Sequence, residues 1–185
     1  MKVYFIRHAK TEDDLNGMTQ TDGSQIILDI ETLAKTRDIK QKLKDIKVFS
    51  SPLRRAIQTA QLISDGFSTI KHFREVISPK VTETMTHDER KAFWEKNKES
   101  KTNPNWKNDG SESFNQIKKR VEKAYRFLNK QKRKYKENEI AIVTHSNFLK
   151  HLLFYKVNKN YTQEDYYLIY PLYWDNLSII EVKEI

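Results

Sequence analysis

The chain opens with the stretch MKVYFIRHAK, residues 1–10. Val3 to Ile6 are β-branched and aromatic residues, a run long enough for a buried strand and too short for an ordinary helix. The run stops at Arg7-His8. Open α/β sheets bind their ligands at the carboxyl ends of strands, so this strand would deliver a guanidinium and an imidazole to that edge. The pair indicates a binding site only if other segments bring further cationic or imidazole side chains to the same edge of the sheet.

The composition is that of a globular protein rich in charge, with 37% hydrophobic and 32% charged residues. A length of 185 residues predicts one domain, residues 1–185. The net charge of +9 favours an anionic ligand, although lysines on solvated helix faces explain much of it. The absence of cysteine excludes disulfides and thiolate chemistry. Without a signal segment or a membrane-length apolar run, we expect a cytoplasmic protein.

Strand-like and helix-like segments alternate along the chain, which predicts an α/β fold. We expect a mostly parallel central sheet of about five or six strands with helices on both faces, in three layers. The expected strands are Val3–Ile6, Val48–Phe49, Thr69–Val76, Ile140–Val143, Tyr166–Tyr170 and Leu177–Val182. The expected helices are Thr32–Asp45, a segment from Ser50 towards Gly66, Asp88–Lys98, Ser113–Tyr135 and the residues after His145, while Thr11–Ser24 is expected to be a loop.

Cationic and imidazole side chains follow strand ends at separate places in the chain. These are Arg7-His8, Arg54-Arg55 and His145, with Ser146-Asn147 at the start of the last helix. Each taken singly is more often a solvated or structural residue. Together they describe a phosphate site, because arginine donates paired hydrogen bonds to phosphate oxygens and a helix N-terminus adds backbone N–H groups. A metal site would need carboxylates or more imidazoles at ligand spacing.

Several blocks of sequence, in the right order, resemble one family. They are Arg7-His8-Ala9-Lys10-Thr11 with Gly17 and Gln20 in the following loop, Ser50 to Ala60, Gly110-Ser111-Glu112-Ser113 with Arg120-Val121, Val143-Thr144-His145-Ser146, and Asn176 to Ile180. The family is the histidine phosphatase superfamily, with the phosphoglycerate-mutase-like fold. The resemblance spans nearly the whole chain.

The resemblance implies a role for each residue that matches a family motif. His8 would be the nucleophile that takes the phosphoryl group, with His145 as a second catalytic imidazole. Arg7, Arg55 and His145 would hold the phosphate oxygens, and Ser146 would contribute its backbone N–H. A neutral imidazole is a competent nucleophile near neutral pH, which agrees with this assignment. No metal or other cofactor is implied.

The sequence departs from the family pattern around the site. Lys10 replaces the common Glu, Asp14 stands where the signature loop has Asn, and Met18 replaces a frequent Arg of the substrate loop. Ser146 stands where most members have Gly, a change that is tolerable if its backbone N–H is what meets the phosphate.

The general acid is the least determined residue of the resemblance. Family members supply a Glu after the third strand, and Phe73-Arg74-Glu75 fits the first part of that block. We therefore expect Glu75 to be the acid and later the base. A surface role for Glu75 is the alternative reading, and Glu83 and Asp88 are the rival candidates.

The function that follows is a phosphomonoesterase acting on a small phosphorylated substrate through a phosphohistidine on His8. A phosphorylated protein is a further possible substrate, and a membrane partner is not expected. Phosphoglycerate-mutase-type transfer and a non-catalytic phosphate-binding module stay open as alternatives. Nucleic-acid binding through Lys130 to Lys136 is not expected, because helix-terminal lysines already have a structural explanation.

Substrate choice is expected to depend on the loop around Met18 and on the segment from Ile77 to Trp106. This segment carries large apolar side chains, Phe93, Trp94 and Trp106, for which we favour a packing role. The sequence identifies neither the substrate nor the oligomeric state.

Overall fold

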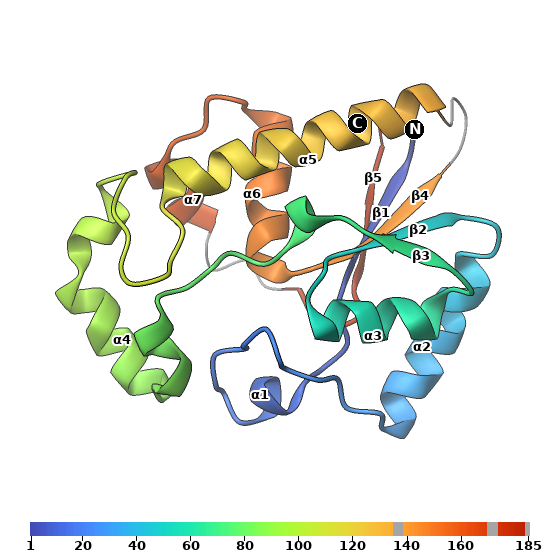
Figure 1. Ribbon diagram of the computed structural model, residues 1–185, viewed down its shortest axis with the longest axis horizontal. Coiled ribbons are helices and arrows are strands. Elements are labelled where there is room, and N and C mark those ends of the chain that lie inside the picture. The colour runs from blue at the N-terminus through green and yellow to red at the C-terminus, as the bar shows by residue number, and fades with distance from the viewer. Residues whose placement is uncertain (135–138, 170–173, 184–185) are drawn as a thin grey trace.

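A computed structural model describes residues 1–134, 139–169 and 174–183. These residues form a five-stranded sheet in the order β3-β2-β4-β1-β5, with helices around it (Figure 1). Strands β1 to β4 pair in parallel, whereas β5 pairs antiparallel to β1 at one edge. The strands are β1 (Val3–Arg7), β2 (Lys47–Ser50), β3 (Phe67–Thr69), β4 (Ile140–Thr144) and β5 (Ile179–Val182). The predicted α/β class with a mostly parallel sheet is confirmed.

Strand β1 lies in the interior of the sheet, between β4 and β5, and all five of its residues are buried. A strand covered on both faces has to be apolar along its length, which explains the unbroken run from Val3 to Ile6. Its register with β4 pairs Arg7 with Thr144, so both strands end side by side. The next residue of each chain segment is a histidine, His8 and His145.

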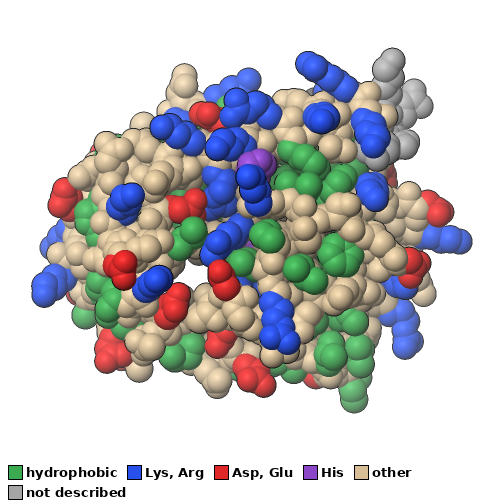
Figure 2. All heavy atoms as spheres, in the orientation of Figure 1, with side chains coloured by type: hydrophobic (Ala, Val, Ile, Leu, Met, Phe, Trp, Pro, Cys, Tyr) green, Lys and Arg blue, Asp and Glu red, His purple; other side chains and the backbone are tan. Residues whose placement is uncertain are grey.

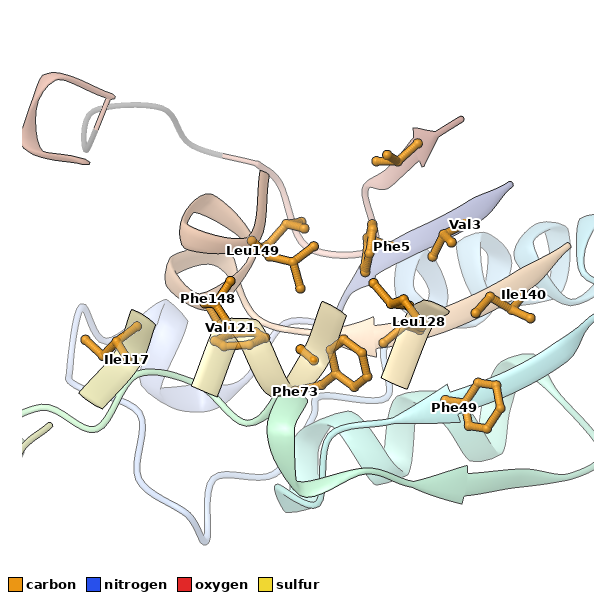
Figure 3. Packing of buried hydrophobic residues seen from close by; sticks show 14 residues of the cluster. Val3, Phe5, Phe49, Phe73, Ile117, Val121, Leu128, Ile140, Phe148 and Leu149 are labelled. Carbon is orange, nitrogen blue, oxygen red and sulfur yellow. The ribbon is translucent and has the colours of Figure 1, made fainter. Parts of the chain in front are cut away.

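The helices cover both faces of the sheet. On one face, alternate strand residues pack against α5 and α6 (Figure 3); they are Val3, Phe5, Ile140 and Ile142. On the other face, the intervening residues pack against α2 and α3; they are Tyr4, Ile6, Ala141 and Val143. This alternation gives the predicted three layers. The helices are α1 (Glu12–Leu15), α2 (Ile30–Lys42), α3 (Arg54–Ile63), α4 (His87–Lys96), α5 (Phe114–Lys134), α6 (Ser146–Val157) and α7 (Gln163–Ile169).

Helix α5 agrees with the longest helix expected from the sequence. Gln116 Oε1 accepts from the Ser113 backbone N–H at 3.0 Å, and Ser113 Oγ accepts from the Gln116 N–H at 3.3 Å, as capping-box spacing predicts. Tyr135 and Lys136, which the expected helix and basic run included, lie outside the described residues. No helix within residues 1–134, 139–169 and 174–183 has the length and apolar character needed to cross a membrane.

The strand expected over Thr69–Val76 is wrong. Strand β3 ends at Thr69, and a 3₁₀ turn, Lys71–Phe73, follows it. The turn inserts Phe73 fully into the core beneath the sheet edge, where its carbonyl accepts a 2.9 Å hydrogen bond from Thr144 Oγ1. This tertiary anchoring redirects the chain towards the ends of the central strands.

The strand expected over Tyr166–Tyr170 is also wrong, because this segment belongs to helix α7 (Tyr170 lies outside the described residues). The reason is local: Asp165 Oδ2 accepts from the Thr162 N–H at 2.8 Å, and Thr162 Oγ1 accepts from the Asp165 N–H at 3.2 Å. These reciprocal bonds start a helix and override the strand preference of the tyrosines. A similar pair, Thr11 and Asp14, starts the short α1 inside the expected loop.

His151 on α6 joins this helix to α7. Its ring is fully buried, stacks on Tyr166 at 3.7 Å between centroids, and lies 3.0 Å from the Tyr161 hydroxyl through Nδ1. Burial holds the pKa of His151 well below its ordinary value, and the charges of Arg120 and Lys150 lower it further. The folded chain therefore keeps this imidazole neutral.

Replacing His151 by Phe should make stability less dependent on pH. Below about pH 6.5 the unfolded chain protonates this histidine and the folded chain does not, so acid lowers the free energy of unfolding of the wild-type protein. The difference should approach about 1.4 kcal/mol per pH unit. Urea unfolding at pH 7, 6 and 5 measures it. Tyr161→Phe, which keeps His151, is the control with an unchanged slope, and parallel profiles for wild type and His151→Phe would contradict the assignment.

Candidate active site

His8 and His145 meet at the ends of the adjacent strands β1 and β4. The His8 backbone N–H donates to the Thr144 carbonyl at 3.1 Å, extending the ladder by one bond. The imidazole centroids are 5.1 Å apart and the ring planes are inclined at 51°. Both side chains are almost completely buried. Parallel pairing thus brings together residues that are far apart in the sequence.

The hydrogen bonds of His8 define which ring nitrogen carries the proton and which carries the lone pair. Nδ1 lies 2.7 Å from the Ala9 carbonyl oxygen, and this partner requires a proton on Nδ1. Nε2 then carries a lone pair, which accepts a hydrogen bond from Arg55 Nε at 3.3 Å. The backbone of the signature segment therefore fixes both the tautomer and the direction of Nε2.

Burial keeps both imidazoles neutral. It is the main cause that holds the pKa of His8 well below its ordinary value, and the Arg55 guanidinium adds to it. The pKa of His145 is lowered in the same way, by burial and then by Arg55. His145 Nε2 lies 2.7 Å from Ser51 Oγ, while its buried Nδ1 has no hydrogen-bond partner among the described residues.

Arg7, the last residue of β1, is held by the loop that follows it and by the far end of the chain. Its Nη2 donates to Asp14 Oδ1 at 3.2 Å, and Nη1 donates to the Trp174 carbonyl at 2.5 Å. Asn176 Nδ2 donates to the His8 carbonyl at 3.0 Å and reaches Asp14 Oδ2 at 3.4 Å. Asp14, the departure from the family pattern, thus serves as the anionic partner of Arg7.

Arg55 comes from the first turn of α3, after β2, and its side chain is 1% exposed. Nη1 donates to the Thr21 carbonyl at 2.8 Å. One turn later, Thr59 Oγ1 accepts from the Ala9 N–H at 2.9 Å, which fixes α3 against the His8 segment. Burial lowers the pKa of Arg55, and the carboxylate of Glu75 opposes this shift. Arg54, its neighbour in the helix, is exposed.

Glu75 lies just after the 3₁₀ turn, with its carboxylate at the N-terminus of α6. Oε1 accepts from the backbone N–H groups of Phe148 and Val76, both at 2.8 Å, and Oε2 accepts from Asn147 at 3.3 Å. The first backbone N–H groups of a helix have no partner within the helix, and here they orient the Glu75 side chain. Ser146, the first residue of α6, lines the same cavity as Glu75.

An ion pair holds the backbone that presents Glu75. Arg120 on α5 binds Glu112 in a bidentate manner, at 2.8 Å and 2.5 Å. The same guanidinium donates to the carbonyls of Arg74 at 2.5 Å and Glu75 at 3.3 Å. Glu112 and Arg120, which belong to one of the sequence blocks that resemble the family, thus hold the backbone on either side of the Glu75 side chain.

The rival carboxylates lie farther out. Glu83 lines the cavity but is exposed, and Asp88 on α4 is exposed and is not one of the residues that line the cavity. Within the part of the chain that the structure describes, no group of three or more His, Asp or Glu side chains is placed to hold a metal ion.

Arg7, Arg55, Glu75 and Ser146 line a cavity of about 1020 Å³, whereas the buried His8 and His145 are not among its lining residues; the charged residues of the lining are mainly basic. Figure 2 shows Lys and Arg side chains along the hollow between the α4 segment and the rest of the molecule. The acidic residues of the wall are Asp14, Asp22, Glu75 and Glu83, and the basic ones are Arg7, Arg55, Arg74, Lys80, Arg90, Lys91 and Lys150. The excess of positive charge suits an anionic ligand.

Lys150, in the second turn of α6, is a site residue that the sequence analysis missed. It is 4% exposed and lines the cavity, and burial lowers its pKa while the Glu75 carboxylate raises it. The available signal was a lone cation inside the apolar run Phe148 to Leu153. Such a position points either to the solvent side of a helix or to a buried anionic partner.

The segment from Ile77 to Trp106 forms the outer wall of this cavity. Phe93, Trp94 and Trp106 pack on one another, with centroid distances of 5.1 Å and 5.9 Å between successive rings. Trp94 and Met18 also line the cavity. The aromatic residues therefore pack together, as the sequence analysis favoured, and at least one of them also faces the site.

Comparison with solved structures supports the same architecture. Phosphoserine phosphatase from Entamoeba histolytica, in complex with 3-phosphoglyceric acid, superposes with a TM-score of 0.75 at 22% identity, over 97% of this chain and 89% of the other. The mycobacterial glucosyl-3-phosphoglycerate phosphatase superposes with a TM-score of 0.75 at 15% identity, over 97% of this chain and 88% of the other. For α-ribazole phosphatase from Shigella flexneri the TM-score is 0.65 at 23% identity, over 91% of this chain and 84% of the other.

No curated protein sequence matches this chain. The model of the histidine phosphatase superfamily (branch 1), however, matches residues 3–183, a span that includes both strand-end histidines and the closing strand. The fold, the order of the motifs and this match agree, and the chain belongs to the histidine phosphatase superfamily.

Proposed function

We propose that the protein is a phosphomonoesterase that forms a phosphohistidine on His8. The observation that carries this proposal is the fixed His8 tautomer, with the Nε2 lone pair directed at Arg55 in a buried, cationic site. Nε2 attacks phosphorus and forms the N–P bond while the bond from phosphorus to the leaving oxygen breaks. Water then attacks the phosphohistidine, which releases inorganic phosphate and restores neutral His8.

Arg7, Arg55, His145 and the Ser146 N–H bind the phosphate oxygens in this proposal. Arg55 exchanges its hydrogen bond with His8 for one with the phosphate, which frees Nε2 for attack. The guanidiniums then face the charge that shifts to the oxygens as the bond breaks.

Glu75 is the proposed proton donor to the leaving oxygen and the base that activates water in the second step. It shares the cavity wall with Arg7, Arg55 and Ser146, and the Arg120–Glu112 pair holds its backbone. Release of one backbone hydrogen bond would leave a carboxyl oxygen able to carry the proton. The exposed positions of Glu83 and Asp88 favour Glu75 over either rival.

The substrate is proposed to be a small phosphorylated molecule, in keeping with the phosphatase relatives described above. A phosphorylated protein side chain fits the same chemistry. The cytoplasmic location expected from the sequence stays a prediction.

Substituting His8 by Ala should abolish hydrolysis of 4-nitrophenyl phosphate, with a loss on the order of a thousandfold or more, because no other imidazole in the site presents an equivalent Nε2. Assays with chelator present measure the released nitrophenol and phosphate. Alkaline quench of wild-type protein with labelled substrate should trap label on the chain, and His8→Ala should trap none. His72→Ala, at a half-buried histidine outside the cavity, is the control that keeps activity.

Full activity in His8→Ala would overturn the mechanism. Label that passes from the chain to monophosphoglycerate without release of phosphate would instead favour a mutase. Tight binding of phosphorylated compounds without any turnover would favour a phosphate-binding module.

Changing Glu75 to Gln should affect esters according to their leaving groups. Alkyl phosphates need a proton on the departing oxygen, so their kcat/KM should fall about 10²- to 10⁴-fold, the usual contribution of a general acid. Phosphorylation of His8 by 4-nitrophenyl phosphate should be much less affected, because nitrophenolate leaves without a proton. Rapid-quench measurement of phosphoenzyme formation separates this step from hydrolysis.

The matched control for this experiment is Glu83→Gln, which removes an exposed carboxylate from the same cavity. Its activity towards both esters should stay within about twofold of wild type, since exposed charges contribute little. Equal losses for alkyl and aryl esters in Glu75→Gln, or a large loss in Glu83→Gln, would reassign the acid.

A further inference from the structure

A second cavity, of about 560 Å³, lies beside the first and has an aromatic lining. Its volume falls within the range of pockets that enclose small organic ligands. It lies between the segment from Ile77 to Trp106, the start of α5, and helices α6 and α7. The aromatic side chains of its wall are Trp94, Trp106, Phe114, His151, Tyr166 and Tyr167.

The two cavities are adjacent, because six residues line both of them. Val76, Ile77, Ser78, Lys91, Trp94 and Asn147 line both of them. Val76 follows Glu75 directly, and the Asn147 N–H donates to Glu75 Oε2. The second cavity therefore begins beside the carboxyl group that we propose protonates the leaving oxygen.

A buried hydrogen-bond acceptor lies in this aromatic wall. Gln163 on α7 is 9% exposed and lines the cavity. Its Nε2 donates to the Ser100 carbonyl, which fixes the orientation of the amide. Oε1 is buried and has no hydrogen-bond partner within residues 1–134, 139–169 and 174–183. An acceptor in such a position favours a ligand with an N–H or O–H donor, because leaving it unpaired is costly.

The second cavity has fewer charged lining residues than the first. They are Lys91, Lys101, Glu95 and Glu112. Glu112 is already occupied by Arg120 and by the Ile77 N–H at 3.1 Å. The second cavity therefore suits an uncharged group rather than a carboxylate or a second phosphate.

We infer that the second cavity binds the leaving group of the substrate, and that this group is an uncharged planar aromatic ring with a hydrogen-bond donor for Gln163 Oε1. The inference rests on the proposed phosphomonoesterase function and names its substrate class. Aromatic walls bind such a ring by face and edge contacts, and Gln163 selects for the donor.

The test compares esters that differ in the leaving group alone. These are 2-(indol-3-yl)ethyl phosphate, its N-methylindole analogue and propyl phosphate, all primary alkyl esters of similar intrinsic reactivity. The indole ester should exceed propyl phosphate in kcat/KM by about tenfold or more, because it buries an aromatic ring. N-methylation should lower kcat/KM about fivefold to tenfold, the usual effect of one lost hydrogen bond.

Gln163→Met retains a side chain of similar length and removes the acceptor. In this variant the indole ester and its N-methyl analogue should have equal kcat/KM. Gln41→Met, at an exposed glutamine of α2, is the matched control and should preserve the wild-type ratio. A preference for the N–H compound that survives Gln163→Met would overturn the assignment of Gln163.

Calorimetry with the corresponding phosphonates, which are not hydrolysed, separates this inference from the proposed function. If wild-type protein releases no phosphate from any ester, the proposed function fails, and the affinities still test the cavity. Binding of the indolylethyl phosphonate about tenfold tighter than propylphosphonate supports an aromatic site. Equal affinities together with equal kcat/KM for indole and propyl compounds overturn the inference.

Discussion

The parallel pairing of β1 with β4 is the constraint on which the site depends. The register that places Arg7 opposite Thr144 makes the following residues neighbours, and these are the two buried histidines. A shift of one residue along β1 would turn His8 to the other face of the sheet. Helices bury both strands on either face, so the imidazole pair lies at the edge of the packed core.

Around this pair the protein combines strong positive charge with close packing. Arg55 and His8 are almost completely buried, and their environment opposes protonation of the imidazole. Keeping such groups out of water opposes folding, and the hydrogen bonds of Arg7, Arg55 and Asn176 to backbone carbonyls offset part of this cost. Packing of the core thus offsets the cost of keeping the His8 imidazole buried, neutral and oriented.

The sequence predicts the central part of the molecule better than its periphery. Apolar runs that end in Arg7-His8 and His145 are local signals, and parallel pairing brings them together. The positions of Phe73 and Glu75 depend on contacts with Thr144, Arg120 and the α6 N-terminus, which no local pattern contains. The tyrosines of α7 favour a strand in the sequence, but the reciprocal hydrogen bonds of Thr162 and Asp165 start a helix there. The buried amide of Gln163 had no recognisable sequence signal.

The strand order has a consequence for how the protein is made. β1 leaves the ribosome before its neighbours in the sheet, which are β4 and β5, at Ile140–Thr144 and Ile179–Val182. During synthesis the apolar segment Val3 to Ile6 therefore has no sheet partner until β4 has emerged. Such a segment is a natural target for chaperones that shield nascent apolar strands. The strand that leads into the proposed nucleophile is thus made before the strands that bury it, and the position of His8 is fixed after β4 has paired with β1.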